Sequence, residues 1–198
     1  MSKLGDEAGV NGRRPLASLL AIASLSWVAC ASPPSGIAPV GFPEESLPID
    51  LSRFMGDWYV IAHIPLPQEA DAHEAIERYE MQDDGMIDVL FTFCDERIDG
   101  PLQEYTMRAW VYDEETNAEW RVRPFWPLSL GYQIVELDPD YRETVVVNAS
   151  GYAWIMAREM AIDGDRFAAM TTRLEERGFD TSLLRNVPHD DGRCSEAG

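Results

Sequence analysis

Hydrophobic and polar residues alternate in eight separate stretches of this chain. The stretches cover residues 57–64, 75–82, 86–94, 103–112, 118–125, 131–138, 143–149 and 152–159. Turn-forming segments such as Asp83-Asp84-Gly85 separate them. Because the side chains of a strand point alternately to its two faces, the pattern predicts short antiparallel strands, as in a β-barrel or a β-sandwich.

A different periodicity follows the last of these stretches. Phe167, Met170 and Leu174 recur at helical spacing, and Gly178 is a typical residue at a helix end. The spacing predicts one amphipathic helix over residues 166–177, which packs its apolar stripe against the sheet. The polar face of this helix carries acids as well as arginines, so it lacks the basic character of a membrane-surface helix.

Three short motifs lie at the ends of the predicted strands. Gly56-Asp57-Trp58-Tyr59 begins the first stretch, Leu137-Asp138 and Tyr141 flank a turn, and Trp154 to Arg158 close the last stretch. Together and in this order they resemble the signature of the lipocalins, with Gly56, Trp58, Asp138, Tyr141 and Arg158 as its structural residues. Phe125-Trp126-Pro127 and the segment 131–135 look most like the bacterial lipocalins, which are often outer-membrane lipoproteins.

The resemblance covers roughly residues 48–187 and implies a specific fold. This fold is all-β: an eight-stranded antiparallel up-and-down β-barrel with one C-terminal α-helix packed outside. In that family Trp58 packs across the barrel floor against the guanidinium of Arg158, a cation–π contact. Residues 65–74, the longest connection, correspond to the lid loop over the barrel mouth.

The alternation also predicts which side chains face inward. Parity alone fits a sandwich core equally well, so it is the resemblance that implies a hollow for a ligand. Glu77 shares parity with Tyr79, which places it inside unless a bulge turns it out to solvent, and both orientations remain open. The residues expected to contact the ligand are Val60, Ala62, Glu77, Tyr79, Ile87, Val89, Phe91, Tyr105, Met107, Ala109, Trp120, Val122, Tyr132, Ile134, Trp154 and Met156.

Composition excludes some classes of partner. The chain has 198 residues, of which 45% are hydrophobic, and a formal net charge of −19 at pH 7. This is enough apolar material for one sizeable core, and the negative charge repels nucleic acid. We therefore expect one domain, no nucleic-acid partner, and a monomer or homodimer.

The N-terminal part has the pattern of an export signal. Residues 1–29 contain Arg13-Arg14 and then a short apolar run, which is typical of a signal peptide and too short to span a bilayer. The residues before Cys30 look like a lipobox, so Cys30 is expected to carry a lipid anchor, although Trp27 departs from the pattern. Cleavage near Ala31 would instead release a soluble protein. Residues 30–47, rich in proline and serine, predict a flexible tether, 48–187 the barrel domain and 188–198 a tail.

The sequence gives little support for a catalytic site or a metal site. The histidines, His63, His73 and His189, lack metal-ligand spacing and are expected at the surface. Some lipocalins are enzymes that use a cysteine inside the barrel, but parity turns Cys94 outward. We expect no enzyme, no cofactor and no metal site.

The cysteines and the function follow from the resemblance. Many lipocalins join their C-terminal segment to the barrel wall, which implies a Cys94–Cys194 disulfide; the alternative is a free thiol in the tail. The implied function is to bind and carry or store a fatty acid or lysophospholipid in the bacterial cell envelope. The envelope site is the outer membrane facing the periplasm, or a soluble periplasmic or secreted form. A binder of a pigment, haem or other flat hydrophobe is the alternative, for which the six tryptophans would suit stacking.

Overall fold

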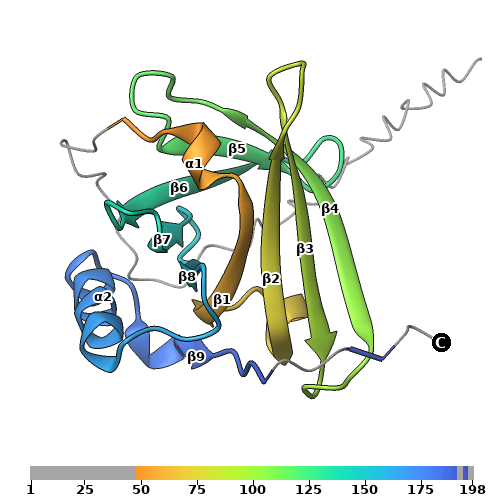
Figure 1. Cartoon of the computed structure of the whole chain (residues 1–198), viewed down its shortest axis with the longest axis vertical. Coiled ribbons are helices and arrows are strands. Elements are labelled where there is room, and N and C mark those ends of the chain that lie inside the picture. The colour runs from red at the N-terminus through yellow and green to blue at the C-terminus, as the bar shows by residue number, and fades with distance from the viewer. Residues whose placement is uncertain (1–47, 191–193, 196–198) are drawn as a thin grey trace, which may run out of the picture. The chain divides into compact units, whose positions relative to one another are not determined.

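Eight antiparallel strands close into a barrel, with a helix outside its wall (Figure 1). The computed structural model describes residues 48–190 and 194–195, so the expected signal peptide, the tether and Cys30 lie outside the described residues. Each expected stretch overlaps one strand, with differences of up to three residues at the ends, and the predicted fold class is confirmed. The strands are β1 (Gly56–Ile64), β2 (Ala72–Met81), β3 (Ile87–Asp95), β4 (Leu102–Val111), β5 (Glu119–Arg123), β6 (Leu130–Leu137), β7 (Glu143–Val147) and β8 (Ala153–Ala157).

The barrel follows the order of the chain. Neighbouring strands pair from β2 to β8, and β1 then closes the ring because it pairs with both β8 and β2. A two-residue strand, β9 (Arg185–Asn186), joins the second half of β1. The first half of β1 pairs with β2, so β9 occupies the edge that β2 leaves uncovered. This short strand carried no alternation, and the sequence analysis missed it.

A short helix and an arginine seal one end of the barrel. The helix α1 (Leu51–Phe54) inserts Phe54, which is fully buried against the rings of Trp58, Tyr79 and Trp120. The guanidinium of Arg158 lies 3.8 Å from the centre of the Trp58 ring and donates a hydrogen bond to the carbonyl of Phe54. Burial lowers the pKa of Arg158 to about 10, so it remains a cation at neutral pH. This end is therefore a packed floor.

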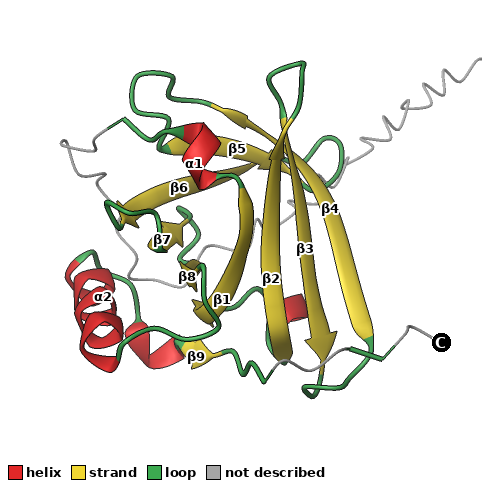
Figure 2. Cartoon of the chain, in the orientation of Figure 1, coloured by secondary structure: helices red, strands yellow, loops and turns green. Residues whose placement is uncertain are grey.

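The long helix α2 (Gly164–Glu176) covers the outside of the barrel (Figure 2). Met170 and Leu174 are buried in a second apolar cluster that includes Val145 and Ile155 of β7 and β8. The helix begins two residues before the predicted start, because the side chain of Asp163 caps it by accepting hydrogen bonds from the first free amides. No helix among the described residues is both long and apolar enough to span a bilayer.

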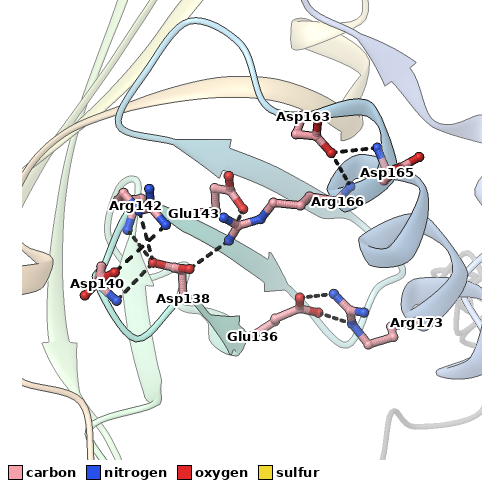
Figure 3. Close-up of polar contacts among 9 residues, drawn as sticks. All are labelled: Glu136, Asp138, Asp140, Arg142, Glu143, Asp163, Asp165, Arg166 and Arg173. Atoms are coloured by element: carbon pink, nitrogen blue, oxygen red, sulfur yellow. Dashed lines mark hydrogen bonds and ion pairs between the residues drawn. The ribbon is translucent and has the colours of Figure 1, made fainter.

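Charged side chains fasten α2 to the turn between β6 and β7 (Figure 3). Arg166 of the helix lies 2.7 Å from Asp138 and 2.6 Å from Glu143. Burial alone would raise the pKa of Asp138, but hydrogen bonds from Arg166 and from backbone amides of the turn lower it below its usual range. Arg173, about two turns further along the helix, pairs with Glu136. Asp138 thus organises both the turn and the helix contact.

We expect Asp138→Asn to lower the free energy of unfolding by about 1–2 kcal/mol at neutral pH, because Arg166 and the amides of the turn lose their charged acceptor. A carboxyl whose pKa is lowered on folding stabilises the protein above its ordinary pKa, and this contribution disappears as pH falls through the lowered value. Urea denaturation of both proteins at neutral and acid pH should therefore give curves that converge below about pH 4. A difference that is independent of pH would contradict this role of Asp138.

The C-terminal segment returns along the barrel wall. Cys194 forms a disulfide with Cys94 at the end of β3. Next to it, the amide of Ser195 donates to the carbonyl of Gly100, and the amide of Leu102 donates to Ser195. Cys94 and Cys194 therefore form a covalent bridge between the tail and the edge of β3 and β4.

Candidate functional site

A hollow opens at the end of the barrel opposite the floor. The space between its lining residues is roughly 540 Å³ when the solvent-filled mouth is counted, so the enclosed part is smaller. Its lining is largely apolar and combines strand residues with residues of the surrounding loops. The residues that line it are Leu66, Glu69, Glu77, Val89, Phe91, Met107, Val122, Leu130, Gly131, Tyr132, Asn148 and Trp154.

The structure divides the residues expected to contact a ligand into two groups. Glu77, Val89, Phe91, Met107, Val122, Tyr132 and Trp154 line the hollow. A second group belongs to the packed core and is absent from the lining, because α1 fills the lower part of the barrel with Phe54. This group consists of Val60, Tyr79, Ile87, Ala109, Trp120, Ile134 and Met156. The ligand hollow is consequently shorter than the barrel.

Tyr105 and Ala62 belong neither to the lining of the hollow nor to the buried core cluster. Tyr105 is more than one third exposed and stacks on Phe93. The pairing of β1 with β8 shifts between Val60 and Ala62, and Ala62 is then opposite Ile155, which faces the outer cluster under α2. Opposed residues of an antiparallel pair share a face, so the bulge turns Ala62 away from the interior. Its inward placement by parity is therefore wrong.

The same bulge brings His63 inward. His63 is opposite Trp154, which lines the hollow, and the histidine is only 1% exposed. Its Nδ1 lies 3.5 Å from a carboxylate oxygen of Glu69, and the same oxygen accepts a hydrogen bond from the Trp154 indole. The expected surface position of His63 is wrong, because strict alternation ignored the extra residue.

The side chain of His189 is also buried, although this residue lies in the tail. Its Nε2 lies 2.9 Å from the carbonyl of Val60, and its Nδ1 lies 3.4 Å from Glu74. The surface prediction for this residue was wrong because the tail folds back onto β1. No group of three or more potential metal-ligating side chains occurs within residues 48–190 and 194–195.

Glu77 faces into the hollow, which resolves the orientation that the sequence left open. It is 7% exposed, and its Oε2 has no hydrogen-bond partner among the described residues. Burial, and next the nearby Glu69 carboxylate, raise the pKa of Glu77 to about 8. On the floor side of Glu77 along β2, the hydroxyl of Tyr79 lies 2.5 Å from the hydroxyl of Tyr132. Burial and the charge of Glu77 raise the pKa of Tyr132 as well.

The sequence analysis missed the lining residues that come from loops and strand ends. Glu69 belongs to the one-turn helix η1 (Pro67–Glu69) in the lid loop, and Asn148 follows β7. Leu66, Leu130 and Gly131 complete the mouth. Parity could not select these residues because loops have no alternation. The length of the lid loop was the available signal that this segment reaches over the mouth.

A closed barrel with a packed floor and an apolar hollow at one end defines a class of protein. It is the class of small β-barrels that hold one small hydrophobic ligand in their interior. A family model described as a lipocalin-like domain matches residues 49–189. This chain belongs to the lipocalin family.

Individual relatives agree with this assignment. The chain is 30% identical over 166 residues to the outer membrane lipoprotein Blc of Escherichia coli, covering 82% of this chain and 89% of that protein. It is 26% identical to the temperature-induced lipocalin-1 of Arabidopsis thaliana, covering 72% and 81%. Among solved structures, insecticyanin of the tobacco hornworm Manduca sexta has a TM-score of 0.60 at 16% identity, covering 82% and 95%. This last likeness concerns the fold alone.

Proposed function

We propose that this protein reversibly carries or stores a single-chain lipid, a fatty acid or a lysophospholipid, in the bacterial cell envelope. The observation that carries the proposal is the apolar hollow between the mouth and the aromatic floor. Burial of hydrocarbon contributes about 0.8 kcal/mol per methylene, so a chain with ten methylenes gains roughly 8 kcal/mol before the costs of ordering. Such an affinity suits reversible carriage in support of membrane maintenance.

Of the two lipids, the lysophospholipid suits the interior better. Glu77 and Glu69 both present carboxyl groups to the hollow, and no lysine or arginine is among its described lining residues. A fatty-acid carboxylate would add a further negative charge in a place of low dielectric. A zwitterionic head group avoids this repulsion.

The proposed location is the outer membrane, facing the periplasm. Several relatives are outer membrane lipoproteins, as their names state. In this chain the lipobox-like residues before Cys30 support the same type of anchor. A soluble periplasmic or secreted form is the alternative, and the mass of the mature N-terminal peptide distinguishes the two.

Binding of a pigment, haem or another flat hydrophobe is less well supported. That alternative relied on the tryptophans, of which Trp58 and Trp120 are packed into the floor. Trp126 is 82% exposed and Trp110 is covered by Arg123. Within the described residues, Trp154 alone offers its ring to the hollow. Enzymatic use of the strand cysteine is disfavoured because Cys94 is in a disulfide.

Native mass spectrometry of protein purified without detergent tests the proposal. We expect a 1:1 complex of protein and lipid. Activation should release a single-chain lipid of one or two chain lengths. A lysophospholipid or fatty acid would be identified by its fragments, whereas a bound chromophore would support the alternative. Protein that carries no ligand and takes up no lysophospholipid from micelles would contradict lipid carriage.

Met107→Trp should fill the hollow and lower the affinity for a fluorescent lysophospholipid by at least about tenfold. Met107 lines the hollow, whereas its neighbour Thr106 on the same strand is exposed and points away. Thr106→Trp is therefore the matched control, with unchanged affinity. Titration by fluorescence, with circular dichroism to verify the fold, gives the result. Equal affinities of the two variants would contradict the assignment of this hollow as the lipid site.

A further inference from the structure

One oxygen of the Glu77 carboxyl group has no hydrogen-bond partner among the described residues. The side chain projects from β2 into the hollow, where this oxygen, Oε2, is buried. A buried polar atom without a partner costs free energy, commonly on the order of 1–3 kcal/mol. A ligand that donates a hydrogen bond at this position would remove that cost.

The other groups around the hollow make it electronegative. The lid contributes the carboxylate of Glu69, which acts on Glu77 electrostatically. Strand β1 contributes His63, which is engaged with Glu69, and β6 contributes the Tyr132 hydroxyl, which is engaged with Tyr79. Strand β3 contributes Phe91, opposite Glu77, and no charge. Among the described lining residues there is no cationic side chain that would neutralise Glu77.

We infer that the hollow selects amphiphiles with a primary ammonium head group, which Glu77 holds by a charge-assisted hydrogen bond. This inference rests on the proposed function, because it names the head group of the lipid that the hollow accepts. Glu77 is opposite Trp58 of the floor in the β1–β2 register, so the ammonium group lies deep in the hollow. The hydrocarbon chain then extends toward Leu66 and Leu130 at the mouth.

An ammonium ion satisfies the two requirements of this site together. It donates to the unpaired oxygen, and its positive charge is attracted by both carboxyl groups in a low-dielectric surrounding. A hydroxyl group can donate a hydrogen bond but carries no positive charge, and a carboxylate is repelled. Because the empty site holds Glu77 largely protonated at neutral pH, ammonium binding displaces a proton. Affinity for the ammonium ligand should therefore rise with pH until Glu77 is ionised.

Isothermal titration calorimetry with decylammonium, decanoate and decanol tests the inference, since the three probes share one chain. At about pH 9 we expect decylammonium to bind at least about tenfold more tightly than decanoate. Glu77→Gln should remove this preference and change decanol affinity less than about twofold. Glu80→Gln is the matched control, because Glu80 is exposed on the same strand. It should behave as the unmodified protein.

The outcomes separate the inference from the proposed function. If decanol binds but decylammonium has no advantage over decanoate, or if Glu77→Gln keeps that advantage, the head-group inference is overturned while lipid binding stands. If none of the three probes binds, both are overturned. The unmodified protein provides a test that needs no variant: decylammonium affinity that does not rise between about pH 6 and pH 9 also overturns the inference.

Discussion

A Cys94→Ala, Cys194→Ala double variant is expected to lose about 3–4 kcal/mol of unfolding free energy. The two cysteines are 100 residues apart in sequence, and their bond removes entropy from the unfolded chain. The chain-entropy relation gives at most about 4.7 kcal/mol for a loop of this length. The bridge also holds Ser195, which pairs with the β3–β4 turn and so extends the barrel wall.

Urea denaturation with and without reductant measures this effect. Reduced protein and the double variant should unfold at the same urea concentration, well below oxidised protein. The control is the double variant with reductant, which should show no further change. Thiol titration of the denatured, unreduced mature protein should find neither Cys94 nor Cys194 reactive, and two reactive thiols would contradict the bridge.

Arg158→Ala is expected to destabilise the barrel by about 3 kcal/mol, mostly by opening the floor. The guanidinium stacks on Trp58 and also donates hydrogen bonds to backbone carbonyls at the start of β1 and in the segment before it, and to one in the turn between β6 and β7. Removal of the side chain leaves these carbonyls unpaired in a partly buried place. The carbonyls belong to Arg53, Phe54, Met55, Asp57 and Tyr141.

Arg158→Lys and Arg142→Ala make this measurement specific. Lysine keeps the charge but lacks the planar fork that reaches several carbonyls, so Arg158→Lys should lie between the alanine variant and the unmodified protein. Arg142 is largely exposed near the same end, and its removal should cost less than about 1 kcal/mol. Equal melting temperatures of Arg158→Ala and Arg142→Ala would contradict the role of Arg158 in the floor.

Local patterns account for the parts of the fold that the sequence predicted. Alternation and turn residues are properties of neighbouring positions, so the eight strands and the helix followed from them, with shifts of a few residues at the ends. The cap of α2 shows the limit, because Asp163 had to be recognised as the residue whose side chain begins the helix. The small helix α1 and the strand β9 are too short to have a period of their own.

The errors at Ala62 and His63 have one physical origin. A single bulge after Val60 reverses parity, and it moves Ala62 out and His63 in without any signal in composition. Glu77 was ambiguous for the same reason; the irregularity in β2 lies before it, between His73 and Ile76, so Glu77 keeps the same face as Tyr79. A side chain's face is determined by the register between strands that are distant in sequence.

The sequence by itself determined the strands, the amphipathic helix and the motif residues Trp58 and Arg158, because each depends on short-range pattern or on residue type. Only the tertiary structure decided how much of the barrel is hollow. Phe54 enters from α1 and fills the floor, and Glu69 reaches over the mouth from the lid. These contacts join segments without shared periodicity, and they leave the Glu77 carboxyl as a polar group with an unpaired oxygen inside an apolar space.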